Sequence, residues 1–531
     1  MDRTEKARVY AAVVILIGIL SFIATVKFTF GFTPSTVVHT FLWVLTHFGS
    51  WPRFYIVPVI TMILAAIAVG AFLEYITPAF AGARFGRFYR GSEVVKAREL
   101  AGKTREFDWK KKRPKQQITI AGIPMPEEAQ STHVAVGGST GVGKSTLVKE
   151  MMYCMLQYQH RFFAMDPNGA FYSTFGRPKR DVLLNPFDTR SEGWVFFNEI
   201  RNPEFDFETY SRSIVQQSAS VDEEQWNGYG RLLLTEVSKK VYANRRQPTI
   251  DEVFDWCCIQ PMEDLEEYVR GTPAQSLFTG NEKATASARF VLSNKLAPHL
   301  KMPRGTFSIR QWLADNKGGN MYVTWDENMR QTLIPLLSTF ADATFTSLLG
   351  MGETDGPPIW TFLDELESYA YLPNLNDLLT KGRKHMRGGG VVTGWQAFSQ
   401  LVEVYGENMA ETLLGNHRTT IGMGVGRYGE KTAKKMSDAF GQHQVQRDKN
   451  GTSMQSGRLG MNRSFNTETI TESVILPSEF MRLRNLHGYL AFPGDLPIAK
   501  FKTRPVKYQR SEKVPGIILR TGDQAGSMAA A

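Results

Sequence analysis

The sequence has 531 residues, which is enough for several domains and for a hydrophobic core that needs no disulfide or metal support. Its hydrophobic and charged fractions, 42% and 21%, exclude a wholly disordered chain. The three cysteines form no CxxC pair, which argues against a disulfide framework or a cysteine metal site and favours a reducing compartment. The net charge of +10 comes largely from residues 84–115, where twelve Lys or Arg outnumber four Asp or Glu.

Two apolar stretches near the N-terminus predict membrane-spanning helices. Residues 9–26 and residues 54–72 contain no charged side chain, and each approaches the length of about 20 residues that a helix needs to cross a bilayer. The first stretch could instead be a cleaved signal peptide behind a basic start, but no small-residue cleavage site follows it and a second apolar stretch comes soon after. We therefore expect a retained transmembrane hairpin.

The flanking charges predict how this hairpin is oriented. The basic N-terminus and the cluster at residues 84–115 belong on the cytoplasmic side, and the segment between the two apolar stretches is nearly uncharged. Everything after Ile76 is therefore predicted to be cytoplasmic. The basic cluster could also be a nucleic-acid-binding patch, but its position beside an apolar stretch favours contact with anionic lipid.

A phosphate-binding loop follows a short apolar strand predicted at residues 132–136. The sequence GSTGVGKS at residues 138–145 fits G-x(4)-G-K-[ST], and a predicted helix follows at once. In such a loop the backbone N–H groups cradle phosphate oxygens, Lys144 reaches the β- and γ-phosphates, and the Ser145 hydroxyl binds Mg²⁺. The predicted nucleotide-binding residues are Gly138, Ser139, Thr140, Gly141, Val142, Gly143, Lys144, Ser145 and Thr146.

An acidic pair far downstream predicts the rest of the catalytic site. Residues 359–363 form an apolar run typical of a strand buried on both faces of a parallel sheet, and Asp364 and Glu365 follow directly. Asp364 could hold Mg²⁺ through water, and Glu365 could polarise the attacking water. The alternative is a helix start decorated by carboxylates, but a phosphate-binding loop in the same chain favours the catalytic interpretation. No base-reading motif of a switch GTPase stands out, so ATP is the predicted nucleotide.

Two further polar residues are candidates for the same site. Residues 389–393 predict the next core strand, ending near Gln396, whose side chain could contact the γ-phosphate. Arg383, at the expected end of a helix, could reach across a subunit boundary as an arginine finger. The alternative is that Arg383 and its basic neighbours only solvate the helix end, and the local pattern leaves both interpretations open.

The remaining apolar runs predict an α/β fold. Strands predicted at residues 160–165, 320–325 and 418–423 are separated by helical patterns, which indicates a parallel sheet. Residues 206–310 instead contain helical patterns throughout, and a crossover of that length is too long for a simple βαβ unit. We expect an inserted all-α domain there.

Taken in order, these motifs resemble the type IV secretion coupling proteins of the TraD/TrwB type. The resemblance extends from the hairpin anchor to about residue 505. It rests on ITIAGIPMP, DVLLNPFDTRSEGW, FLDELESYAYLPNL with the following GRK and GWQAFSQL, YGEKTAKKMSDAFG, and ILPSEFMRLRNLHGYLAFPGDLPIAKFK.

The resemblance implies a RecA-like ATPase that forms a homohexamer on the bacterial inner membrane. Such a protein recruits a relaxase–DNA complex, or protein effectors, and hands it to the secretion channel. The trans-acting arginine of the family maps to Arg383 and its glutamine to Gln396. The implied domains are a transmembrane hairpin (1–80), a RecA-like nucleotide-binding domain (81–205 and 311–508), an inserted all-α domain that engages substrate (206–310) and a flexible C-terminal tail (509–531).

The leading hypothesis is an ATP-driven translocase of DNA in conjugation that contacts DNA mainly through its phosphates, without sequence preference. An FtsK-like pump for double-stranded DNA shares the fold, but we find no long linker or winged-helix-like C-terminal module. A receptor for protein effectors that uses ATP only for assembly is the third hypothesis. It predicts nucleotide-dependent oligomers without stimulation of hydrolysis by DNA.

Overall fold

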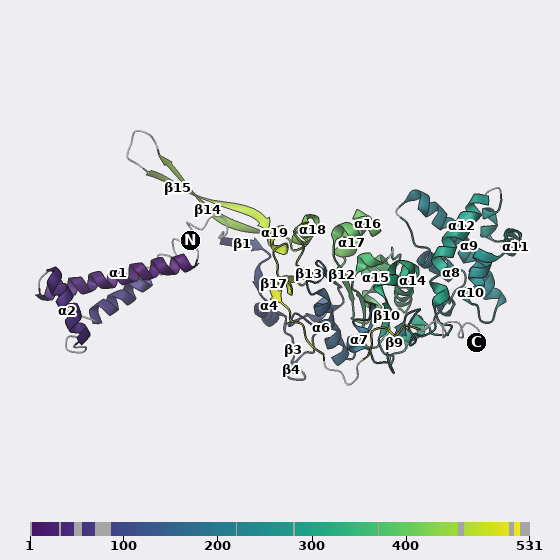
Figure 1. The fold of residues 1–531 in the computed structure, drawn as a ribbon, viewed down its shortest axis with the longest axis horizontal. Helices are drawn as coiled ribbons and strands as arrows, with labels where there is room; N and C mark the ends of the chain where they lie inside the picture. The colour runs from purple at the N-terminus through teal and green to yellow at the C-terminus, as the bar shows by residue number, and fades with distance from the viewer. Residues whose placement is uncertain are drawn as a thin grey trace. The chain divides into compact units, whose positions relative to one another are not determined.

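The computed structural model describes residues 3–30, 33–46, 56–68, 87–218, 220–279, 282–369, 371–454, 461–508 and 514–520. The chain divides into two compact units. One comprises Met1–Gly91 with His443–Glu472, and the other comprises Ser92–Gln442 with Ser473–Ala531. Figure 1 shows the helices and strands of both units.

The first unit begins with apolar helices: α1 (Arg3–Phe30), α2 (Pro34–Thr46) and a helix over Ile56–Ala68. The rings of Phe22 and Phe41 meet edge to face with their centroids 6.0 Å apart. Gly18 leaves room for Met62, because a Cβ atom at this glycine would lie 2.4 Å from the Met62 sulfur. Several apolar side chains of these helices are more than half exposed, among them Ile15, Leu16, Ile19 and Leu20.

Both apolar stretches predicted to span a membrane contain helix. Residues 9–26 lie within α1, and residues 56–68 of the second stretch are helical while its two ends lie outside the described residues. In the described part of the chain, only the helix Glu327–Leu349 has both the length and the hydropathy of a membrane span. However, 78% of its most apolar window is buried inside the protein, so it serves as a core helix of the second unit.

The first unit also contains a three-stranded sheet of order β1-β14-β15. Its strands are β1 (Arg87–Gly91), β14 (Gln442–Met454) and β15 (Met461–Ser473). Strand β1 pairs antiparallel with β14, so that Phe88 lies opposite Val445. The domain division expected from the sequence assigned these strands to the nucleotide-binding domain, whereas the structure groups nearly all of their residues with the N-terminal helices.

The second unit is built on a ten-stranded sheet of order β2-β17-β16-β13-β7-β12-β11-β8-β10-β9. From β13 to β9 all neighbouring strands are parallel, and β16 is antiparallel to both β13 and β17. The strands are β2 (Val94–Lys96), β7 (Val134–Gly137), β8 (Arg161–Pro167), β9 (Val182–Leu184), β10 (Met321–Trp325), β11 (Ile359–Leu363), β12 (Val391–Trp395), β13 (Thr419–Met423), β16 (His487–Ala491) and β17 (Ile498–Lys502).

Every strand predicted from an apolar run is present, and β11 matches its predicted bounds at both ends. All five residues of β11 and of β12 are buried, as expected for parallel strands that are covered on both faces. One hydrophobic cluster contains helix α6 (Lys144–Gln157) and the other contains α14 (Arg330–Leu349). A mixed α/β unit with a central parallel sheet fits a RecA-like domain.

Most of the described part of residues 206–310 is helical, and this described part contains no strand. They contain α8 (Asp206–Ile214), α9 (Val221–Asn244), α10 (Ile250–Phe254), a π-helical turn (Asp255–Ile259), α11 (Met262–Tyr268), α12 (Glu282–Leu296) and the start of α13 (Ile309–Ala314). Figure 1 shows α8 to α12 gathered as one helical group. Their core is continuous with that of the sheet on the α14 side, where the Ser213 hydroxyl donates a hydrogen bond to Asp342.

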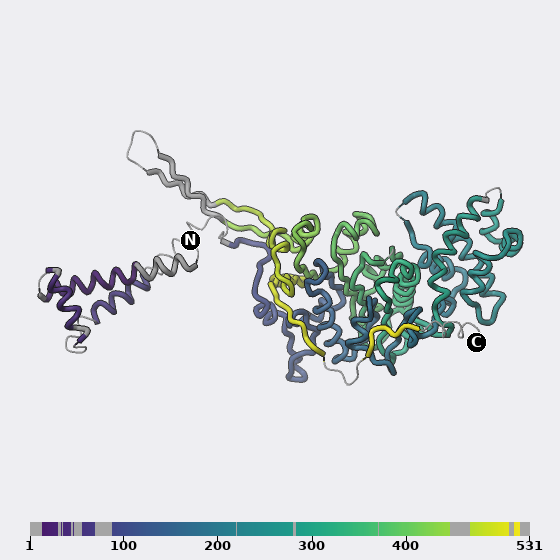
Figure 2. The backbone as a smooth tube through the Cα atoms, in the orientation of Figure 1, coloured from purple at the N-terminus to yellow at the C-terminus, as the bar shows by residue number. Residues whose placement is uncertain are grey.

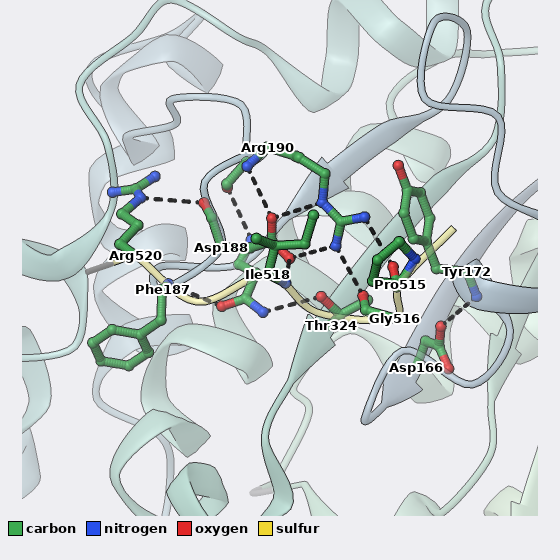
Figure 3. Close-up of polar contacts among 12 residues, drawn as sticks. Asp166, Tyr172, Phe187, Asp188, Arg190, Thr324, Pro515, Gly516, Ile518 and Arg520 are labelled. Atoms are coloured by element: carbon green, nitrogen blue, oxygen red, sulfur yellow. Dashed lines mark hydrogen bonds and ion pairs between the residues drawn. The ribbon is translucent and has the colours of Figure 1, made fainter. Parts of the chain in front are cut away.

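The C-terminal segment departs from the flexible tail expected at residues 509–531. The described part, residues 514–520, docks on the loop after β9 (Figures 2 and 3). Asp188, which is fully buried, accepts hydrogen bonds from the backbone N–H of Ile518 at 2.8 Å and from the Arg190 guanidinium at 2.6 and 2.9 Å. Arg190 also donates to the carbonyl oxygen of Gly516 at 3.1 Å. This stretch is therefore an ordered strap.

Candidate nucleotide-binding and catalytic site

The predicted phosphate-binding loop connects β7 to the first residue of α6. Gly138, Gly141 and Gly143 all have positive φ values, of 155°, 76° and 110°, a conformation that residues with a Cβ rarely adopt. A Cβ atom on Gly143 would also lie 2.7 Å from the side chain of Leu486. The glycines therefore let the loop turn tightly and pack against Leu486 of the same chain. The loop ends at the N-terminus of α6.

Lys144 closes the loop on itself. Its ammonium group donates hydrogen bonds to the carbonyl oxygens of Gly138 at 2.6 Å and Ser139 at 3.4 Å. The side chain is buried, and burial lowers the pKa of Lys144, while the nearby carboxylates of Asp364, Glu367 and Glu365 oppose this shift. The Lys144 ammonium group thus lies close to several carboxylates, in a loop whose glycine conformations suit a phosphate group.

The acid pair follows β11 at the same edge of the sheet. Ser145 donates a hydrogen bond from its hydroxyl to Oδ2 of Asp364 at 3.2 Å, while the buried Oδ1 of Asp364 has no hydrogen-bond partner among the described residues. Burial raises the pKa of Asp364 to about 6, and the charge of Lys144 opposes the shift. A hydroxyl and a carboxylate oxygen side by side, one carboxylate oxygen still unpaired, fit the oxygen ligands that Mg²⁺ prefers.

Gln396 connects the phosphate-binding loop to the acid pair. Its amide oxygen accepts a hydrogen bond from the Thr140 hydroxyl at 2.6 Å, and its amide nitrogen donates to Oε1 of Glu365. Strand β12, which ends at Trp395, lies between β7 and β11. The structure therefore brings Gln396 and Glu365 together beside the phosphate-binding loop.

Two acidic residues near this site were not assigned from the sequence. Glu367 accepts a hydrogen bond from the backbone N–H of Gln396 at 2.7 Å, and burial raises its pKa to about 7. Asp166, in β8, accepts from the backbone N–H groups of Phe171 and Tyr172 at 2.9 and 2.7 Å, and burial raises its pKa to about 7. Asp166 could have been noticed because it ends a predicted strand. Glu367 carries no signal beyond its place two residues after Glu365.

Arg383 lies at the opposite edge of the sheet. It belongs to a 3₁₀ turn (Gly382–Lys384) between α15 (Leu375–Lys381) and the start of β12. Three residues later, the carbonyl oxygen of Met386 accepts a hydrogen bond from the backbone N–H of Ile359, the first residue of β11. The side chain of Arg383 is exposed. The structure therefore does not bring Arg383 to the phosphate-binding loop of its own chain.

The sequence matches a family model described as the type IV secretion-system coupling protein DNA-binding domain, over residues 117–504. The chain belongs to this family. The resemblance drawn from its motifs is therefore confirmed. The coupling protein TraD of Escherichia coli (strain K12) is 25% identical over 513 residues, covering 92% of this chain and 67% of TraD.

This chain is also similar to solved structures of the conjugative coupling protein TrwB. The unbound form of TrwBdeltaN70 is 42% identical, with a TM-score of 0.74 over 83% of this chain and 98% of that one. TrwB in complex with the ATP analogue ADPNP is 41% identical, with a TM-score of 0.74 over 83% of this chain and 100% of that one. The complex of TrwB with ADP and Mg²⁺ gives the same identity and TM-score over 83% and 99%.

Proposed function

We propose that this coupling protein is an ATPase of the bacterial inner membrane that drives DNA, delivered with its relaxase, into a type IV secretion channel during conjugation. The observation that carries the proposal is the convergence at one edge of the sheet of Lys144, the Ser145–Asp364 pair and the Glu365–Gln396 pair. These groups come from three neighbouring strands, and together they supply what phosphoryl transfer to water requires.

The nucleotide and its metal are inferred from this donor set. TrwB binds ADPNP, and ADP with Mg²⁺, and the loop of this chain offers the same kind of site. Residues 138–146 would hold the phosphates, and Ser145 and Asp364 would hold Mg²⁺, which neutralises charge on the phosphates when bound. The buried and unpaired Oδ1 of Asp364 supports this assignment.

The hydrolytic step falls to Glu365, oriented by its neighbours. Gln396 Nε2 and the Ser368 hydroxyl each donate to one oxygen of Glu365, so the carboxylate is fixed in place. It would accept a proton from the attacking water, while Lys144 offsets charge on the β- and γ-phosphates. Gln396, hydrogen-bonded to Thr140 of the phosphate-binding loop, would register whether the γ-phosphate is present.

Arg383 supports assembly into a ring. Because it lies at the amino edge of the sheet, away from its own phosphate-binding loop, it can complete only the site of an adjacent subunit. We infer a homohexamer in which each Arg383 acts as a finger on its neighbour's nucleotide, as in related RecA-like motors.

The N-terminal helices support a membrane anchor. Exposed apolar side chains on α1 and on the helix Ile56–Ala68 would be covered by lipid, and the basic residues at 84–115 would face the anionic cytoplasmic surface. A motor tethered in this way exerts force on a strand relative to the membrane. The helical residues 206–310 would form the surface that engages the relaxase–DNA complex or a protein effector.

The proposal is tested by ATP turnover of the purified full chain against single-stranded and double-stranded DNA at two salt concentrations. We expect slow basal turnover that DNA stimulates, with stimulation falling at higher salt because the contacts are to phosphates. The Lys144→Ala variant is the background control. If neither kind of DNA changed the rate of ATP turnover while nucleotide still drove assembly, the result would favour a receptor for protein effectors that uses ATP only for assembly. A requirement for double-stranded DNA would favour an FtsK-like pump.

A further inference from the structure

The backbone at the end of β12 is held from two sides. The carbonyl oxygen of Trp395 accepts a hydrogen bond from the N–H of Gly138 at 3.1 Å. The N–H of the next residue, Gln396, donates to Oε1 of Glu367 at 2.7 Å. These two groups belong to the same peptide unit, so this one peptide is held by the phosphate-binding loop through its C=O and by the turn after the acid pair through its N–H. The Gln396 side chain starts from the Cα atom that follows it.

Glu367 is held on a short, firmly anchored element. It lies in a 3₁₀ turn (Leu366–Ser368) directly after Glu365. The fully buried side chain of Leu366 anchors one side of this turn, and the carbonyl oxygen of Ser368 accepts a hydrogen bond from Arg330 at 3.0 Å on the other. The carboxylate of Glu367 therefore has little freedom to follow Gln396 if that residue moves.

We propose that Glu367 is a positioning residue that holds Gln396 between Thr140 and Glu365. The inference rests on the proposed hydrolytic function for its kinetic consequence, but its structural part does not. The side chain of Gln396 makes one bond to the phosphate-binding loop and one to Glu365, and both require its Cα to stay in place. The bond to Glu367 holds the N–H side of the peptide between Trp395 and Gln396, at the point where the chain leaves the strand.

A carboxylate that merely satisfied a backbone N–H group would be expected to matter for stability alone. Glu367 differs because its partner, Gln396, makes two side-chain contacts at the proposed reaction site. Small displacements of a catalytic group lower rates steeply, about 10²-fold for roughly 1 Å. We therefore expect the loss of Glu367 to lower kcat far more than it changes KM.

The kinetic test compares Glu367→Ala, Glu367→Gln, Gln396→Ala and the double variant Glu367→Ala/Gln396→Ala in the full chain. Glu367→Ala should lower kcat by about 10-fold to 10²-fold, with KM for ATP changed less than about twofold. Glu367→Gln keeps an oxygen acceptor for the Gln396 N–H, so it should recover most of the lost rate. The double variant should turn over no more slowly than Gln396→Ala, because both changes remove the same interaction.

A second measurement does not depend on turnover. Hydrogen–deuterium exchange at the amide of Gln396, in the absence of nucleotide, should be faster in Glu367→Ala and close to wild type in Glu367→Gln. The matched control is Glu403→Ala, an exposed glutamate on α16 (Phe398–Tyr405). The inference would be overturned if the Gln396 amide exchanged at the wild-type rate in Glu367→Ala. It would also be overturned if the losses of kcat in the two single variants multiplied in the double variant. If the wild-type chain showed no ATP turnover, the proposed function would be wrong. The hydrogen–deuterium exchange at the Gln396 amide would still decide whether Glu367 holds this residue in place.

Discussion

The ten-stranded sheet buries ionisable side chains at its carboxyl edge, where the parallel strands end, and at its amino edge, where they begin. The two groups of side chains differ in the direction of their pKa shifts and in their hydrogen bonding. At the carboxyl edge, burial raises the pKa of Asp364 to about 6 and that of Glu367 to about 7. Each keeps one buried oxygen without a hydrogen-bond partner among the described residues. At the amino edge, burial lowers the pKa of His133 to about 4 and that of His417 to about 3.

The histidines differ from the acids in how their polar atoms are used. His133 Nδ1 accepts from the backbone N–H of Val391 at 3.0 Å, so its Nε2 carries the proton and donates to a backbone carbonyl, also at 3.0 Å. Both ring nitrogens of His417 are likewise bonded, one to the Thr393 hydroxyl. Burial alone therefore does not mark a functional site. What distinguishes Asp364 and Glu367 is that their buried, unpaired oxygens lie beside the phosphate-binding loop, where a bound ligand can supply the missing partner.

The largest expected effect is at the carboxyl edge. Lys144→Ala removes the only ammonium group that bonds within the phosphate-binding loop in the described structure, and ATP turnover should fall to the background of the assay. Lys434→Ala, an exposed lysine on α18 (Glu430–Ala439), is the control and should behave as wild type. Measurable turnover in Lys144→Ala, with the protein folded, would mean that the site lies elsewhere.

Under the proposed function, the amino edge contributes to chemistry only through Arg383 acting on an adjacent subunit. Arg383→Ala should lower turnover by roughly 10³-fold, as expected for an arginine that stabilises charge on the transferring phosphate. Mixed rings of Arg383→Ala and Lys144→Ala subunits should recover part of the activity, because some interfaces then pair an intact loop with an intact arginine. Recovery is measured as ATP turnover against mixing ratio, with assembly verified by light scattering. No recovery in assembled mixtures would remove the trans role of Arg383.

The sequence predicts what depends on local pattern and misses what depends on distant partners. Strand β11 and the acid pair are predicted because an apolar run followed by Asp364 is a local signal. Glu367 looks like any polar residue until folding places the Gln396 backbone against it. The strap at residues 514–520 is invisible to composition, since its anchor Asp188 is about 330 positions away.

Asp188 provides a contrast to Asp364 and Glu367, because it is a buried acid whose two carboxylate oxygens both accept hydrogen bonds. Its two oxygens accept from the Arg190 guanidinium, the Arg190 N–H and the Ile518 N–H. Asp188→Ala leaves Arg190 without its buried partner and should destabilise the protein by roughly 3 kcal/mol, with ATP turnover at 25 °C changed less than about twofold. Tm measures the loss, and Asp495→Ala, at an exposed position, is the control. A large loss of turnover with unchanged Tm would show that the strap belongs to the active site.

The smallest expected effect is a pH dependence at the amino edge. The pKa of His133 is lowered by burial to about 4, below the 6.5 of a free side chain, so between these values the folded state binds fewer protons than the unfolded one. Stability is therefore lost as the pH falls from about 6.5 to 4, by up to roughly 3 kcal/mol. His133→Gln does not titrate and should lose less Tm than wild type between pH 7 and pH 5, whereas the control His487→Gln should follow wild type. Equal losses of Tm in His133→Gln and in wild type would show that other groups cause the acid sensitivity. The two hydrogen bonds of the His133 ring would then hold the ring in place without contributing to the acid response.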